Sequence, residues 1–187
     1  MQISPEYMEK FDEVFEKYML DFAGPKWRTM CHQAAKISAK SLQLLFPNIK
    51  IKMRRVEVIA WMEGGKSFVH IGWLQDPNKI EGKMPAHFAV EVGKGLYDPT
   101  FYQLRLCKTP LDLPEDPYFY HNEFAKLIAD KNGFRWFYGN RPSGVLHIGY
   151  MFQNEQIPKE DLSKLLSDGE AKKHAEKVAA LCKKIKD

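Results

Sequence analysis

The segment from Ala86 to Thr100 constrains the fold more than any other part of this sequence. Apolar and polar residues alternate along it until Gly93-Lys94-Gly95, a sequence typical of a tight turn. The returning half is short and stops at Asp98. This pattern predicts an antiparallel hairpin with His87 at the start of one strand and Asp98 at the end of the other, so the two side chains should lie side by side.

The composition is that of one folded domain, which we expect to span residues 1–187. The 187 residues are 44% hydrophobic and 13% aromatic, which is enough to fill one core. The sequence starts without a secretory pattern and no apolar run reaches the ~18 residues of a membrane span, so we expect a cytoplasmic protein without a membrane partner. The net charge of +4 is spread along the chain and does not favour nucleic acid as a partner.

Helical periodicity occurs on both sides of the hairpin. Ser4-Pro5 is a good helix start, and Thr29 is a good N-cap for a second helix that Pro47 closes. A C-terminal helical pattern is interrupted near Asp168-Gly169. We expect helices over residues 4–22, 30–46, 119–131 and 159–186.

Alternating apolar and polar residues predict further strands before and after the hairpin. Residues 75–85 and 109–117 are rich in turn formers and should be connections, whereas residues 101–106 fit either a strand or a short helix. Helices that precede and follow a group of mostly antiparallel strands indicate an α+β fold. The expected strands outside the hairpin are 49–62, 67–74, 134–138 and 145–152.

A histidine held by an aspartate can activate a nucleophile, and Cys31 is the candidate nucleophile. It lies in the first turn of the helix expected after Thr29, where backbone N–H groups and the positive end of the helix dipole favour a thiolate. In such a triad His87 takes the thiol proton and later donates it to the leaving group. Asp98 fixes the tautomer and the orientation of the histidine.

Cys31 at a helix start, His87-x-x-x-Glu91-Val92 and Tyr97-Asp98-Pro99-Thr100 together resemble the core of the transglutaminase-like branch of the papain-like cysteine hydrolase superfamily. The resemblance implies the chain order Cys, His, Asp, with the last two on adjacent strands. It also implies a papain-like or transglutaminase-like fold, in which N-terminal helices pack on an antiparallel sheet and a C-terminal helix follows. The sequence departs from the family pattern at Ala89, where an aromatic residue is common, and at Leu96-Tyr97, where a Trp is common nearby.

The resemblance covers residues 27–101, about half of the chain, and it leaves the oxyanion hole open. The papain-like branch supplies a Gln upstream of the nucleophile, but the only Gln before Cys31 is the remote Gln2. One oxyanion donor would be the backbone N–H of Cys31. The second would come from Trp27, Arg28 or another backbone group.

Several other polar residues have simpler interpretations. A metal site built from Cys31, His32 and His87 lacks the usual ligand spacing, so we expect no metal and no cofactor. Glu91 shares a strand face with His87 and either supports it or is a solvated charge. Asn140 is a replacement third member of the triad, should Asp98 lie elsewhere. The remaining candidates, which we interpret as core or strand residues, are His32, His70, Cys107, His147 and Cys182.

These residues predict a cysteine-dependent hydrolase or acyltransferase, of the cysteine peptidase or transglutaminase-like kind. It would act on an amide, isopeptide or thioester bond in a peptide, a protein or a small amide substrate, and water or an amine would resolve the acyl-enzyme. One alternative is a catalytically inactive binding module of the same fold. Another is a basic nucleic-acid-binding domain, whose positive face would contain Lys50, Lys52, Arg54 and Arg55.

Overall fold

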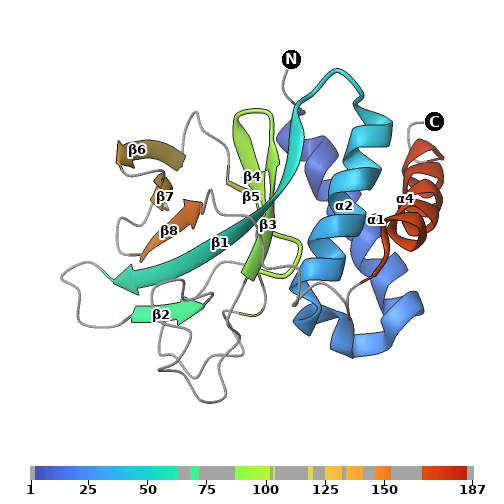
Figure 1. Ribbon diagram of the computed structural model, residues 1–187, viewed down its shortest axis with the longest axis horizontal. Helices are drawn as coiled ribbons and strands as arrows, with labels where there is room; N and C mark the ends of the chain where they lie inside the picture. The colour runs from blue at the N-terminus through green and yellow to red at the C-terminus, as the bar shows by residue number, and fades with distance from the viewer. Residues whose placement is uncertain are drawn as a thin grey trace.

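The chain has an α+β fold in which N-terminal helices and a C-terminal helix lie beside an antiparallel sheet (Figure 1). The fold class predicted from the sequence is confirmed at this level. The computed structural model describes residues 3–62, 68–71, 87–101, 103, 118–119, 125–131, 134–140, 146–152 and 166–184.

The first helix, α1 (Pro5–Ala23), is the one predicted for residues 4–22. The Ser4 hydroxyl oxygen accepts a hydrogen bond from the Tyr7 backbone N–H at 3.2 Å, and Pro5 occupies the first turn, where a missing N–H is harmless. The helix ends at Gly24, whose φ of 63° lies in the left-handed region that glycine adopts without strain. Both ends of α1 therefore follow from local sequence signals.

A six-residue 3-10 helix, η1 (Gly24–Thr29), connects α1 to α2 (Cys31–Leu45). The prediction that Thr29 caps α2 is wrong. The Thr29 hydroxyl instead donates to the Lys26 carbonyl at 2.8 Å within η1, and the N-cap position is Met30, which makes no side-chain capping bond. Cys31 is consequently the first residue of α2.

The C-terminal helix α4 (Asp168–Lys183) begins where the sequence pattern is interrupted. Ser167 and Glu170 form a reciprocal capping box, which gives a strong start at this position. Lys36 of α2 fixes that start, because its ammonium lies 3.1 Å from the Asp168 carboxylate and donates to the Leu166 carbonyl at 2.8 Å. The expected helical residues 159–165 lie outside the described part of the chain.

The sheet is antiparallel at every described pairing, in the order β5-β4-β3-β1-β8-β7-β6, with β2 paired to β1. The strands predicted for 49–62, 67–74, 134–138 and 145–152, and the hairpin, are confirmed to within a few residues. The eight described strands are β1 (Ile51–Met62), β2 (Phe68–Ile71), β3 (His87–Val92), β4 (Gly95–Tyr97), β5 (Tyr118–Phe119), β6 (Ala125–Lys131), β7 (Phe134–Asn140) and β8 (Leu146–Phe152).

The helix predicted over residues 119–131 is wrong, because residues 125–131 form strand β6. This strand pairs with β7, and the last pair, Lys131 with Phe134, leaves only Asn132-Gly133 between the strands. Asn-Gly is a strong hairpin sequence. Pairing with the aromatic-rich strand β7 therefore overrides the helix propensity of the Ala, Lys and Leu residues in β6.

Strand β1 changes partners along its length and so connects the two parts of the sheet. Its first half pairs with β3, and its second half pairs with β8 and β2. Val56 lies opposite His87 of β3, and Val58 lies opposite Tyr150 of β8. Because directly opposed residues share a sheet face, His87 and Tyr150 lie on the same face, two residues apart along β1.

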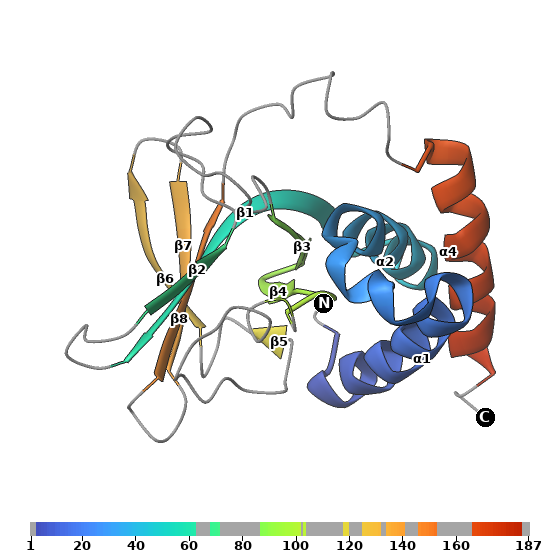
Figure 2. The ribbon, with the colours of Figure 1, turned by 90° about the horizontal axis from the view of Figure 1, so that it is seen from below.

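The largest described core cluster lies between the helices and the β3–β4 hairpin. Figure 2 shows the three long helices gathered beside this hairpin, with β6 and β7 farther away. Alternate β3 residues belong to this cluster, and the strand is buried on both faces along its whole length. Prominent members of the cluster are Met8, Phe11, Phe15, Met19, Ile37, Leu42, Phe88, Val90 and Val92.

Of the described helices, none combines the length and apolar character that a membrane span requires.

His32, the second residue of α2, is a buried core histidine, as the sequence indicates. Its ring lies edge-on against Phe88, with centroids 4.9 Å apart, and its Nδ1 has no hydrogen-bond partner in the described part of the chain. Burial, with a smaller contribution from the Lys36 charge, lowers the pKa of His32 to about 4. The folded protein therefore resists protonation of His32.

This lowered pKa predicts a specific loss of stability in acid. The unfolded chain binds a proton at His32 near pH 6.5 and the folded chain only near pH 4, so stability is lost as the pH falls between these values. When the pH is lowered from 7 to 4.5, the unaltered protein should lose more of its free energy of unfolding than His32→Phe does. The difference between the two losses should be on the order of 1–2 kcal/mol. Urea unfolding at both pH values measures this difference, and equal losses in the two proteins would contradict it.

Candidate active site

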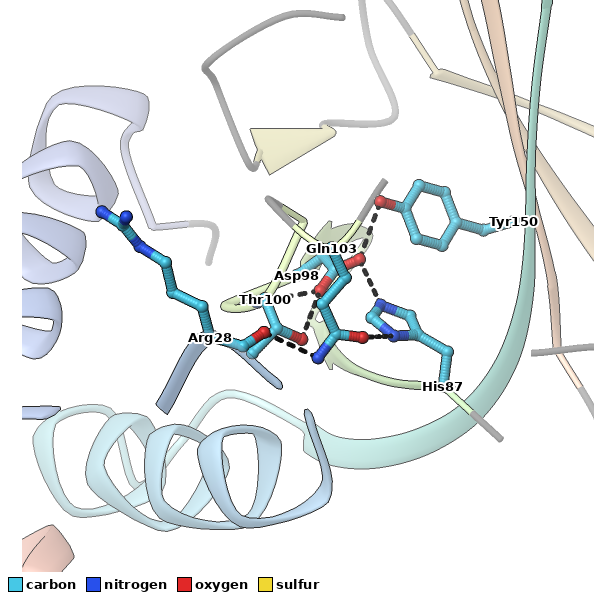
Figure 3. A network of polar contacts seen from close by, with 6 residues as sticks. All are labelled: Arg28, His87, Asp98, Thr100, Gln103 and Tyr150. Carbon is cyan, nitrogen blue, oxygen red and sulfur yellow. Dashed lines mark hydrogen bonds and ion pairs between the residues drawn. The ribbon is translucent and has the colours of Figure 1, made fainter. Parts of the chain in front are cut away.

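The β3–β4 hairpin brings His87 and Asp98 together at its open end. The turn at Gly93 has φ of 61°, and the register pairs Val90 with Tyr97, so Asp98 is the first residue after β4 and lies diagonally across from His87. His87 Nε2 lies 2.7 Å from Asp98 Oδ2, and both side chains are completely buried (Figure 3). The pair is a short, charge-assisted hydrogen bond shielded from water.

Both carboxylate oxygens of Asp98 are held by further donors. Oδ1 accepts from the Thr100 backbone N–H at 3.0 Å and from the Thr100 hydroxyl at 3.4 Å, and Oδ2 also accepts from the Tyr150 hydroxyl at 3.0 Å. Burial first, and then the Asp98 charge, raise the pKa of Tyr150 well above its usual range, so this hydroxyl remains a donor. Asp98 is thus fixed in orientation from three directions.

The sequence does not identify Tyr150 as a site residue. It lies 52 residues after Asp98, inside a predicted strand whose partner is not known from the sequence. Only the pairing of β8 with β1 carries it to the hairpin. A tyrosine among the aromatic residues of a strand gives no local signal of such a contact.

Gln103 is a second site residue that the sequence does not identify. Its Oε1 lies 3.2 Å from His87 Nδ1, and its Nε2 donates to the Arg28 carbonyl at 2.7 Å (Figure 3). Two turn hydrogen bonds, from Phe101 N–H to the Asp98 carbonyl and from Gln103 N–H to the Thr100 carbonyl, bend the chain back toward His87. The segment 101–106, whose structure the pattern leaves open, is the one that contains Gln103.

Cys31 lies against His87 from the start of α2. Burial on its own lowers the pKa of His87, but the charge and hydrogen bond of Asp98, aided by a hydrogen bond with the Cys31 side chain, raise it to about 10. His87 is therefore an imidazolium at neutral pH. Cys31 itself is buried, with 7% of its surface exposed. The structure thus brings together Cys31, His87 and Asp98, the three residues proposed as a triad.

Trp27 and Arg28 lie in η1, directly upstream of Cys31. The Trp27 ring packs edge-on against Phe15 at 6.1 Å, and its Nε1 is a buried donor without a hydrogen-bond partner in the described regions. The Arg28 guanidinium extends away from His87 (Figure 3). It pairs with Glu16 of α1 at 2.6 Å. The Arg28 side chain is therefore held by α1, and its backbone carbonyl accepts the hydrogen bond from Gln103.

Glu91 is not a solvated charge. It is buried, and it lies 2.6 Å from Nη2 and 2.8 Å from Nε of Arg54 across the β1–β3 pairing. Arg54 is thereby engaged within the sheet. This pair shares the sheet face of His87, since Glu91 follows it by four residues in β3 and Arg54 lies opposite Ala89.

The remaining predicted residues lie away from this network or outside the described residues. Burial raises the pKa of the Cys182 thiol to about 11, in keeping with a core cysteine. Asn140 lies in β7 opposite His147 of β8, and His70 lies in β2. Cys107 and Gln2 are outside the described residues. Within the described residues, no group of three or more His, Cys, Asp or Glu could hold a metal ion.

No protein-family model matches this chain, and no curated protein or solved structure shows significant similarity to it. Inferences about its chemistry therefore depend on the geometry of the site.

Replacing Asp98 by Asn should abolish the protonation of His87 at neutral pH. The change removes the negative charge but retains the size of the side chain. Burial, which lowers the pKa of His87, is then no longer offset by the Asp98 charge, which raises it. We expect the pKa of His87 to fall from about 10 to below its ordinary value of 6.5. NMR titration of the imidazole nitrogens in protein with ¹⁵N-labelled histidine measures this value.

The same pair also makes stability depend on alkaline pH. The pKa of His87 in the folded protein lies above its value of about 6.5 in the unfolded chain. The pair therefore contributes fully to the free energy of unfolding below pH 6.5, and this contribution is lost as the pH rises toward about 10. Asp98→Asn should lack this decline in the free energy of unfolding. An unchanged decline, or an unchanged histidine titration, would contradict the electrostatic role of Asp98.

Proposed function

We propose that this protein is a cysteine-dependent hydrolase or acyltransferase of the transglutaminase-like kind, with Cys31, His87 and Asp98 as its triad. The observation that supports the proposal best is that a completely buried His87 contacts both the Asp98 carboxylate, 2.7 Å from its Nε2, and the Cys31 side chain, with which it forms a hydrogen bond. This is the arrangement that thiol nucleophiles require. The bond attacked is an amide, isopeptide or thioester bond.

The reaction follows from the protonation state of the pair. The Cys31 thiolate attacks the carbonyl carbon, and the carbonyl electrons move to its oxygen. As the intermediate collapses, the His87 imidazolium donates its proton to the leaving amine or thiol, and the acyl group remains on sulfur as a thioester. Water or an amine then attacks the thioester, gives its proton to His87, and releases the product and the thiolate.

Two features of the fold support Cys31 as the nucleophile. It is the first residue of α2, where the positive end of the helix dipole favours negative charge on sulfur. It also lies beside a histidine that Asp98 keeps protonated, and an adjacent imidazolium stabilises a thiolate. Cys182 lies instead near the C-terminal end of α4, and burial raises the pKa of its thiol to about 11.

The oxyanion of the intermediate needs two donors close to the attacked carbonyl. The Cys31 backbone N–H at the start of α2 is the first candidate. For the second we favour the Trp27 indole, because it is a buried N–H in η1 without a partner among the described residues, four positions before Cys31. A buried donor left unsatisfied costs stability, and a role toward a substrate oxygen accounts for its retention.

The proposal predicts that Cys31 is much more reactive than the other two cysteines. At pH 6, iodoacetamide should modify Cys31 at least about tenfold faster than Cys107 or Cys182, because only the thiolate reacts and His87 keeps it available. Mass spectrometry of the three cysteine-containing peptides over time gives the three rates. Cys182→Ser should leave the fast rate unchanged, whereas Cys31→Ser should eliminate it.

His87→Gln provides the decisive control for this reactivity. It removes the imidazolium but preserves a polar side chain, so the fast alkylation at pH 6 should slow to the rate of the other cysteines. Slow and equal modification of all three cysteines in the unaltered protein would disprove the catalytic assignment. The inactive binding module of the same fold would then be the better description.

Trp27→Phe should separate the oxyanion hole from the nucleophile. Phe retains the ring contact with Phe15 but lacks the N–H, so the burst of p-nitrophenolate released from p-nitrophenyl acetate should slow by about 10²-fold. Alkylation of Cys31 by iodoacetamide forms no oxyanion, so its rate should not change. Equal slowing of both reactions, or of neither, would argue against an oxyanion role for Trp27.

A further inference from the structure

The Gln103 side chain bridges the two segments from which the triad is assembled. Its amide nitrogen donates to the carbonyl of Arg28, in the 3-10 helix that leads to Cys31, at 2.7 Å. Its amide oxygen lies 3.2 Å from Nδ1 of His87, on the hairpin. Gln103 is 4% exposed, and its contact with His87 is buried.

The direction of these hydrogen bonds determines the protonation of His87. The Arg28 carbonyl can only accept, so Gln103 must present its NH₂ group there and its oxygen to the histidine. That oxygen can also only accept, so Nδ1 must carry a hydrogen. The Asp98 carboxylate makes the same demand on Nε2. Both ring nitrogens therefore face acceptors, which suits only the doubly protonated ring.

We infer that Gln103 is a positioning residue that holds His87 as the doubly protonated acid and ties it to the segment that carries Cys31. The inference rests on the proposed function for its catalytic consequence. The raised pKa of His87 agrees with it. Of the described titratable groups, those against His87 are Asp98 after β4 and Cys31 in α2, with Tyr150 of β8 behind Asp98.

The Asp98 carboxylate and the Gln103 amide oxygen bind the two ring N–H groups of His87 with unequal strength. A general acid needs one proton that it can release more easily than the other. Asp98 is charged and lies 2.7 Å from Nε2, whereas the Gln103 oxygen is neutral and lies 3.2 Å from Nδ1. A charge-assisted hydrogen bond is roughly twice as strong as a neutral one. The Nδ1 proton is therefore the one released to a leaving group, and Gln103 orients it without retaining it.

Gln103→Met tests this inference, because Met has a similar length and no acceptor for Nδ1. We expect the NMR titration midpoint of the His87 nitrogens to fall by about one pH unit, mainly through easier loss of the Nδ1 hydrogen. Gln103→Glu retains an acceptor and should restore the midpoint to at least the unaltered value. Gln43→Met is the matched control, because Gln43 lies at the other end of α2 and bonds the Pro47 carbonyl; it should leave the midpoint unchanged.

A midpoint in Gln103→Met equal to that of the unaltered protein would overturn the inference. If that variant does not fold, a midpoint in Gln103→Glu below the unaltered value would do the same. The failure of the proposed function is recognised separately, because it appears as slow alkylation of Cys31 in the unaltered protein. A shifted midpoint together with slow alkylation would retain Gln103 as the group that protonates His87 and reject its catalytic consequence.

Discussion

The hydrogen bond between His87 and Asp98 is the interaction on which the rest of the site depends. Two oppositely charged groups lie 2.7 Å apart with no exposed surface, and removing such charges from water is costly unless their other hydrogen-bonding groups are also satisfied. In this site, Thr100 and Tyr150 donate to the Asp98 carboxylate, and the Gln103 amide oxygen lies 3.2 Å from Nδ1 of the His87 ring. Losing one charge would leave the other buried alone, so the pair is required as a unit.

This requirement explains why so much of the fold converges on one hairpin. The donors and acceptors around the pair come from segments far apart in the chain: η1 through the Arg28 carbonyl, the turns after β4 through Gln103, and β8 through Tyr150. Strand β1 makes this possible by pairing with β3 in its first half and with β8 in its second. The ion pair therefore becomes fully satisfied only once these long-range pairings exist, which couples completion of the sheet to completion of the site.

The parts of this structure that the sequence predicted are those with local signals. Ser4-Pro5 starts α1, and Gly93 with its neighbours turns the hairpin, so the approach of His87 to Asp98 could be predicted from one short segment. Tyr150 and Gln103 could not, because a strand pairing and two successive turns place them, and neither leaves a periodic pattern. The helix expected at residues 119–131 failed for the same reason, since its partner strand, not its own composition, determines β6.

The contrast between two helical cysteines shows that placement, not residue type, determines the chemistry expected of this chain. Cys182 lies near the C-terminal end of α4, where the helix dipole opposes negative charge, and burial raises its pKa to about 11. Cys31 lies at the N-terminal end of α2, and, against the effect of burial, the Asp98 charge raises the pKa of the His87 imidazole beside it to about 10. The proposed function assigns the nucleophile to the environment of Cys31 and a core role to that of Cys182. The hairpin supplies that difference, because it carries the positive charge to the start of α2.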